Sequence, residues 1–168
     1  QPIDLKDTFV TPSRSYNVFS NITYDPHKKH KISMGFNFFS GNSAGQNVGG
    51  FSLASRENKS KNKFINYRIS ETYLANENLV IQSRFSVNYE STNSFGGANA
   101  VAINVLEAFY GGGSQNDRLN KAWTFDGGND TTWQHKKYGL GFGWRIRGNL
   151  VSQNSTANFG GTYTFSGR

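Results

Sequence analysis

Hydrophobic and polar residues alternate along positions 79–90 with almost no interruption. The apolar members are Leu79, Ile81, Phe85, Val87 and Tyr89. Because successive side chains of a strand point to opposite faces, this pattern predicts a strand with one apolar and one polar face. Its length exceeds the roughly 5–6 residues usual in soluble proteins. It reaches the roughly 9–11 residues that a tilted strand needs to cross a bilayer.

The same alternation recurs in five other parts of the chain. These segments are 16–24, 31–40, 64–74, 118–126 and 136–147. We therefore expect an all-β fold, an antiparallel meander of about six to eight long strands with no helix. The strand length and the two-faced pattern together predict an open segment of a transmembrane β-barrel wall.

The connections between these segments alternate between short and long. Residues 25–30 and 75–78 are short and polar, whereas 41–63, 91–117 and the part from 149 onward are long and rich in Gly, Asn and Ser. Bacterial outer-membrane barrels have short periplasmic turns and longer extracellular loops. The alternation therefore predicts which end of the sheet faces the periplasm. Residues 1–15 are expected to be the tail of a preceding loop.

Composition excludes a helical membrane protein. The chain is 35% hydrophobic with a mean hydropathy of −0.62, and no run approaches the roughly 18 apolar residues that a transmembrane helix requires. A barrel needs no such run, because only alternate residues of its strands face lipid. The absence of Cys is compatible with export to an oxidising compartment.

The net charge of +7 does not indicate a nucleic-acid-binding protein. The basic residues fall in turns, in polar connections or on the polar faces of predicted strands, and no aromatic–basic motif of RNA-binding domains is present. Four arginines, Arg68, Arg84, Arg145 and Arg147, are expected to point into the lumen of the barrel. Such a wall can pair with carboxylates of a plug domain or attract an anionic substrate.

Three short motifs suggest chemistry, and each has a simpler interpretation. Residues 41–45 match G-x-S-x-G, but a nucleophile elbow needs a helix directly after it, which residues 46–50 cannot form. His27 and His30 could hold a metal, yet they flank two lysines in a turn with no third ligand. The glycines of 139–143 alternate with large residues inside a strand and are expected to clear space on the polar face. We expect a non-enzyme without catalytic, cofactor or metal residues.

Two segments carry a resemblance to a known family. They are residues 105–115, Val-Leu-Glu-Ala-Phe-Tyr-Gly-Gly-Gly-Ser-Gln, followed by residues 135–142, and residues 158–166, Asn-Phe-Gly-Gly-Thr-Tyr-Thr-Phe-Ser. The chain resembles TonB-dependent outer-membrane receptors, in the subgroup with an N-terminal carboxypeptidase-regulatory-like domain. Residues 158–166 resemble the strand that follows a long loop in this family. The similarity covers roughly residues 100–168 by motif and the rest by strand style.

The resemblance implies a location in the bacterial outer membrane, within a roughly 22-stranded barrel filled by a plug domain. Such receptors import a nutrient with energy relayed from the inner membrane. The implied partners are outer-membrane lipid, the plug and remaining barrel strands of the parent chain, and the inner-membrane energy-coupling protein. Residues 1–168 would then be a partial barrel domain, a fragment without its plug.

Two other architectures stay open at this point. One is a complete eight-stranded outer-membrane barrel of the adhesin or anchor type, although such barrels usually finish with a C-terminal aromatic and this chain ends Ser-Gly-Arg. The other is a soluble carbohydrate-binding β-sandwich, in which the apolar rows would face each other across a core.

Overall fold

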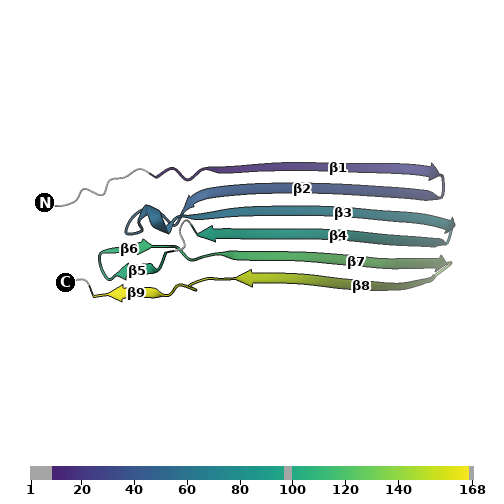
Figure 1. The fold of residues 1–168 in the computed structure, drawn as a ribbon. Helices are drawn as coiled ribbons and strands as arrows, with labels where there is room; N and C mark the ends of the chain where they lie inside the picture. Colours follow the sequence, from purple (N-terminus) through teal and green to yellow (C-terminus); the bar gives the residue numbers. More distant parts are fainter. Residues whose placement is uncertain (1–8, 97–99, 167–168) are drawn as a thin grey trace.

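Six long strands form one antiparallel sheet in the computed structural model, which describes residues 9–96 and 100–166 (Figure 1). Each strand has 15 to 19 residues. In spatial order they are β1 (Ser13–His27), β2 (His30–Gln46), β3 (Asn58–Asn76), β4 (Leu79–Gly96), β7 (Arg118–His135) and β8 (Tyr138–Ser155). The expected all-β meander is therefore confirmed, and every strand is longer than its sequence pattern indicated.

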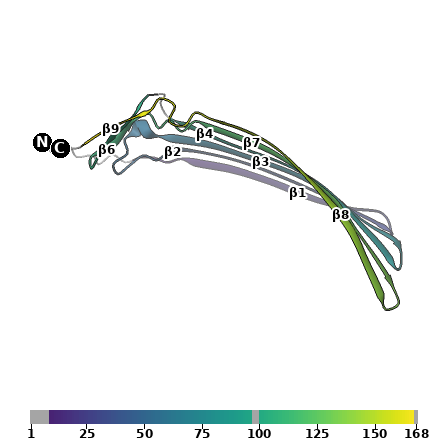
Figure 2. The ribbon, with the colours of Figure 1, turned by 90° about the horizontal axis from the view of Figure 1, so that it is seen from below.

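The sheet is open and one layer thick. Strands β1 and β8 lie at opposite edges and do not pair with each other. Seen edge-on, the six strands form a single layer that bends along its length (Figure 2). Within the described residues no second sheet covers either face of this layer.

Three two-residue turns lie together at one end of the sheet, at positions 28–29, 77–78 and 136–137. In the second turn the Asn76 side chain accepts a hydrogen bond from the Asn78 amide at 2.9 Å, as is usual for Asn in turns. The third turn corrects the sequence analysis, which ended a strand at Asp126 and began the next at Lys136. Instead, β7 continues through Gly127 and Gly128 to His135, and the turn consists of residues 136–137 alone.

The long connections lie at the opposite end and contain a second, smaller sheet that was not expected. This three-stranded sheet is built from β5 (Ala102–Val105), β6 (Phe109–Gly112) and β9 (Thr162–Phe165), with β9 parallel to β5. The first connection spans only residues 47–57, because β2 and β3 extend into the expected loop. Similarly, residues 13–15 belong to β1, whereas residues 1–8 and the expected loop glycine at 97 lie outside the described residues.

The only helical segment of the described chain is a 3₁₀ helix, η1 (Ala54–Arg56), in the connection between β2 and β3. No helix in the described residues is long and apolar enough to cross a membrane.

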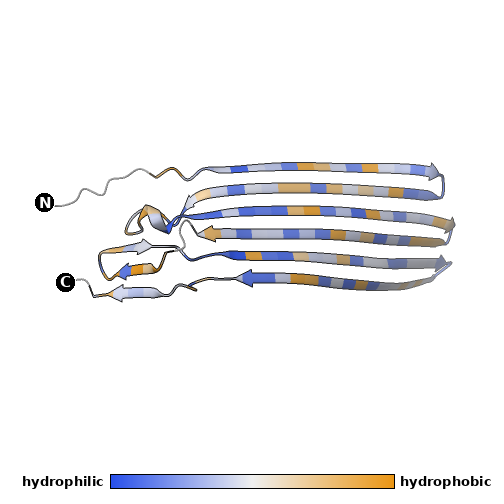
Figure 3. Cartoon of the chain, viewed as in Figure 1, coloured by the Kyte–Doolittle hydropathy of each residue, from blue (hydrophilic) through white to orange (hydrophobic). Residues whose placement is uncertain are grey.

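The pairing register gives the large sheet two distinct faces. Residues directly opposite each other on neighbouring strands share a face, and the registers run without a shift across the middle of all six strands. Apolar and polar residues alternate along the strands (Figure 3). We call the face of Phe85 the apolar face and the face of Arg84 the polar face.

Three adjacent cross-strand rows on the apolar face form an apolar band. All members except Ser20, Gly127 and Gly148 are apolar or aromatic. The rows are Val18, Phe38, Ile65, Tyr89, Trp123, Leu150; Ser20, Phe36, Tyr67, Val87, Phe125, Gly148; and Ile22, Met34, Ile69, Phe85, Gly127, Ile146. On β8 the apolar positions continue to Leu140, about ten residue steps from Leu150. At roughly 3.4 Å per residue and a tilt of roughly 40°, this corresponds to about 26 Å along a barrel axis.

The described chain has almost no core of its own. Ala102 is its only buried hydrophobic residue, and none of its side chains is both large and fully buried. On the apolar face Phe142 is 71% exposed and Ile146 is 69% exposed. Because burial of apolar surface is the main force that stabilises folded proteins in water, this sheet needs an apolar environment that its described residues do not supply.

Candidate functional site on the polar face

The four arginines singled out from the sequence lie together on the polar face. Arg68 of β3 is opposite Ser86, Ser86 is opposite Asp126, and Asp126 is opposite Arg147. In the next row, Arg84 and Arg145 lie on either side of Gly128. Two adjacent rows thus hold all four guanidinium groups. On the other side of the same strands, the first row lies between the Val87 and Phe85 rows of the apolar band, and the second lies just beyond the Phe85 row.

A glycine lets Arg68 extend across a whole strand. The Arg68 guanidinium donates a hydrogen bond to the Asn21 side-chain oxygen at 2.8 Å. Asn21 is on β1, two strands away, and Gly35 of β2 lies between them. A Cβ atom at position 35 would collide with the Arg68 side chain. The missing side chain of Gly35 is therefore what allows Arg68 to lie flat over β2.

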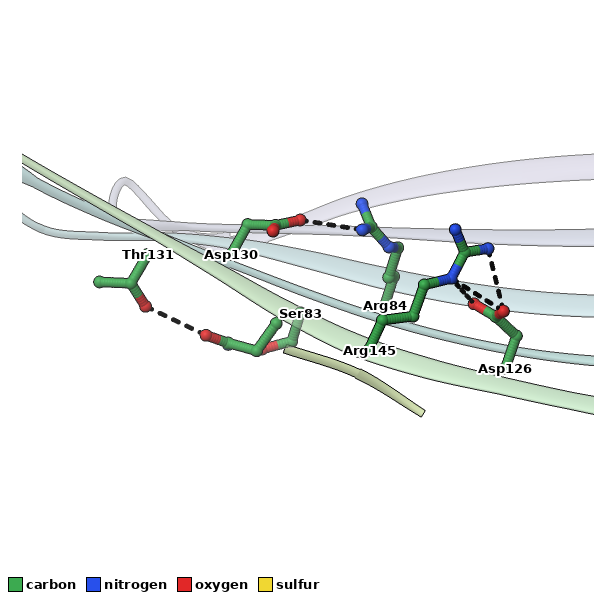
Figure 4. A network of polar contacts seen from close by, with 7 residues as sticks. Ser83, Arg84, Asp126, Asp130, Thr131 and Arg145 are labelled. Carbon is green, nitrogen blue, oxygen red and sulfur yellow. Dashed lines mark hydrogen bonds and ion pairs between the residues drawn. The ribbon is translucent and has the colours of Figure 1, made fainter. Parts of the chain in front are cut away.

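Arg84 forms an ion pair with Asp130 of β7, with 3.0 Å between its Nη2 and the carboxylate. Figure 4 shows both side chains on one side of the strands, and Ser83 and Thr131 on the other side. Gly143 again provides space, because a Cβ there would lie 2.5 Å from an Asp130 oxygen. Both partners are about half exposed, so the pair is accessible from the polar face.

Asp126 accepts hydrogen bonds from two arginines of β8. Its carboxylate oxygen Oδ2 lies 2.9 Å from the Nη2 atom of Arg145 and 2.9 Å from the Nε atom of Arg147. Only 10% of the Asp126 side chain is exposed, whereas the two arginine side chains are each 55% exposed. The two guanidinium groups therefore enclose the carboxylate and turn their outer edges toward the space above the sheet.

A hollow of about 560 Å³ opens over this part of the sheet. The polar-face residues that line it are serines, a threonine, an asparagine, an aspartate and three of the four arginines. These residues are Asn21, Thr23, Ser33, Arg68, Ser70, Arg84, Ser86, Asp126 and Arg145. Planar guanidinium groups with free donors recognise carboxylates and phosphates through paired hydrogen bonds. The four arginines exceed the two aspartates, so the network favours an anion or an acidic protein surface.

The other motifs from the sequence occupy ordinary structural positions. Ser43 continues strand β2 rather than a loop, and its hydroxyl lies 2.7 Å from that of Ser60. His30 pairs with Glu71 at 2.7 Å and stacks on Tyr73. No group of three potential metal ligands occurs within residues 9–96 and 100–166. Gly143 makes room for Asp130 as expected of the 139–143 glycines, while Gly139 and Gly141 face open space.

Asp126 and Asp130 are the site residues that sequence reasoning missed. The strand was expected to end at Asp126, so the carboxylates had no assigned face. The sequence does contain the pattern that would have placed them. Trp123, Phe125 and Trp133 are all odd-numbered, so the even-numbered positions 126 and 130 belong to the opposite, polar face. Gly127, Asn129 and Thr131 interrupt the apolar row between these residues and hide the continuation of the strand.

No protein-family model matches this sequence, and no curated protein matches it.

Proposed function

We propose that the chain is a section of the wall of a transmembrane β-barrel in the bacterial outer membrane. One observation carries the proposal. The three rows of the apolar band cross all six strands, nothing in the described chain covers them, and the opposite side of the same strands carries an arginine–aspartate network. A barrel wall gives each face a matching environment, lipid outside and a polar lumen inside.

Other features support the same assignment. The strands are longer than the roughly 9–11 residues that span a bilayer, and the apolar strip on β8 corresponds to about 26 Å, close to the roughly 25 Å apolar band of such barrels. Two-residue turns at one end and long structured connections at the other agree with their periplasmic and extracellular ends. A sandwich would bury the apolar face under a second sheet, and a complete small barrel would join β1 to β8.

More specifically, we propose that the parent protein is a TonB-dependent receptor that imports a nutrient. The motifs at 105–115 and 158–166 support this family. In such a receptor the polar face lines the lumen, a plug domain approaches the arginine–aspartate network, and the remaining strands pair with the free edges of β1 and β8. The chain has no catalytic role, and energy comes from an inner-membrane partner.

A pair of cysteine substitutions tests the barrel wall. Residues 1–168 contain no Cys, so Val87→Cys and Ser86→Cys can be labelled separately in the full-length protein in outer membranes once any cysteines elsewhere in it are replaced by serine. Val87 lies in the apolar band and Ser86 lies beside it on the polar face. A label at position 87 should be quenched by lipid-soluble quenchers and protected from aqueous ones. A label at position 86 should show the reverse, and identical behaviour at both positions would contradict the proposal.

A further inference from the structure

Basic residues gather on the apolar face directly above the apolar band, at the end of the sheet opposite the three short turns. Next to the band, the Ser91 position has Lys63 on one side and Lys121 on the other. One row further, Lys61 and Arg14 share a row across β1, β2 and β3. We call Arg14, Lys61, Lys63 and Lys121 the basic cluster. Figure 3 shows hydrophilic ends on β3 and β7 at this place.

The basic cluster is exposed and lacks acidic partners. All four side chains belong to exposed residues, and none of them forms an ion pair with a carboxylate of the described chain. Lys59 extends the same side of β3 but pairs with Glu57 at 3.7 Å. Uncompensated like charges on one strand and on every second strand of the sheet repel each other, so an anion bound here would stabilise the sheet.

Two lysine ammonium groups of the cluster lie over aromatic rings of neighbouring strands. The Lys63 Nζ atom lies 5.9 Å from the centre of the Phe38 ring, which belongs to the band, and the Lys61 Nζ atom lies 5.7 Å from that of Phe95. Long basic side chains at a membrane surface place their stems on apolar groups and their charges at the headgroups. A groove of about 380 Å³ runs beside the cluster, lined by Arg14, Asn42, Lys59 and Lys61 among others.

We propose that the basic cluster binds the phosphate groups of anionic lipids in the leaflet next to the long connections. The proposal rests on the orientation of the apolar face toward lipid. Its occupant follows from charge and position. Lys63 and Lys121 lie one row, roughly 7 Å, beyond the band, and Arg14 and Lys61 lie two rows beyond it. In a membrane this is where headgroup phosphates meet the hydrocarbon. Lys63 and Lys121 are two strand spacings of roughly 4.8 Å apart, so both can reach one headgroup.

A local fluorescence experiment tests this lipid site. The full-length protein, with any other cysteines replaced by serine, carries a bimane label at Ser91→Cys, between Lys63 and Lys121. It is reconstituted in phosphatidylcholine vesicles containing a spin label on either phosphatidylcholine or phosphatidic acid. We expect the label to report a preference of roughly fivefold or more for phosphatidic acid, since each nearby cation contributes about that factor at an anionic surface.

Two sets of substitutions distinguish lipid binding at the basic cluster from a general effect of the protein's positive charge. The triple variant Lys61→Gln, Lys63→Gln, Lys121→Gln should remove the preference. The control triple variant Lys28→Gln, Lys136→Gln, Lys137→Gln removes the same charge from the turns at the other end and should retain it. Retention of the preference in the cluster variant would overturn the proposal.

A second label position distinguishes the failure of this proposal from that of the barrel wall. Ser83→Cys lies on the same strand and face but has Glu71 and Asn129 beside it, so its label should be quenched equally by both lipids. If the Ser91 label also shows no preference, the lipid site is wrong while the barrel wall stands. If neither spin-labelled lipid quenches the Ser83 label, the apolar face is not in lipid and both proposals fail. Loss of the preference on adding inorganic phosphate alone would assign the cluster to a soluble anion instead.

Discussion

The carboxylate of Asp126 holds together two arginines that would otherwise repel each other. It is nearly enclosed, with 10% of its side chain exposed, and accepts hydrogen bonds from Arg145 and Arg147. Asp130 offers a natural comparison on the same strand and face, since it is 48% exposed and, within residues 9–96 and 100–166, forms an ion pair with Arg84 alone. The two aspartates therefore differ in enclosure and in the number of cations that depend on them.

This difference predicts unequal effects of two matched substitutions. Asp126→Asn should lower the melting temperature of the full-length protein clearly more than Asp130→Asn, because it leaves two adjacent guanidinium groups without a counter-ion. Thermal unfolding in lipid vesicles or detergent measures both. Adding Arg147→Gln to Asp126→Asn should restore part of the loss, and equal effects of the two single substitutions would contradict the network described here.

The structural roles of individual glycines on the polar face could be predicted only in part. The alternation at 139–143 indicated that glycines clear space, and Gly143 does so for Asp130. That Gly35 allows Arg68 to reach Asn21 depends on the register of three strands, which no local pattern gives. The side chain of residue 68 and the glycine that accommodates it are 33 positions apart in the sequence.

Strands could be predicted where both faces follow the alternation of apolar and polar residues. The continuation of a strand was missed where one face interrupts this alternation. The segments 64–74 and 79–90 were expected and lie within β3 and β4, which continue beyond them because polar residues on both faces still form the ladder. In β7 the apolar face contains Gly127, Asn129 and Thr131, so hydropathy alone suggests a turn. The backbone pairing with β4 and β8 overrides this local signal.

The short strands β5 and β6 left no readable periodicity, because four residues are too few to show an alternation. β9 lies within residues 158–166, where the family motif indicated a strand, but its partner could not be predicted. The parallel pairing of β5 with β9 also joins residues about 60 positions apart, such as Ala102 and Thr162. Contacts of this kind are set by how the strands β4, β7 and β8 bring the connections together, and the sequence pattern carries no information about them.

Within strand β4, neighbouring residues should respond oppositely to a change in charge. Phe85 belongs to the apolar band and Arg84 to the polar face. In the proposed barrel, Phe85→Arg places a cation in hydrocarbon and should cost about 2–4 kcal/mol near the midplane. Arg84→Gln removes one side of a half-exposed ion pair and should cost about 0.2–1 kcal/mol. Unfolding by denaturant in lipid vesicles measures both, and equal costs would indicate a sheet with water on both sides.

Taken as a whole, the described sheet is a curved wall with two incompatible surfaces and two free edges. Its apolar face needs lipid or another apolar layer, and its polar face carries more arginine than aspartate. The edges of β1 and β8 present unpaired backbone groups that a neighbouring strand can complete. A larger barrel satisfies all three requirements at once, which is why the proposal concerns a parent protein rather than this chain alone.

Within such a receptor, Arg68 is the arginine best placed to hold a plug domain. Among the described residues Arg84, Arg145 and Arg147 have aspartate partners, whereas Arg68 donates to the neutral Asn21. We expect Arg68→Gln to loosen the plug and increase passive leakage of small solutes from proteoliposomes, while ligand affinity at the outer face stays unchanged. Arg84→Gln serves as the control and should raise leakage less, because the carboxylate paired with Arg84 belongs to the wall itself. Reduced nutrient uptake with unaltered leakage would instead indicate a path for anions along the arginines, and no change in either quantity would exclude both roles for Arg68.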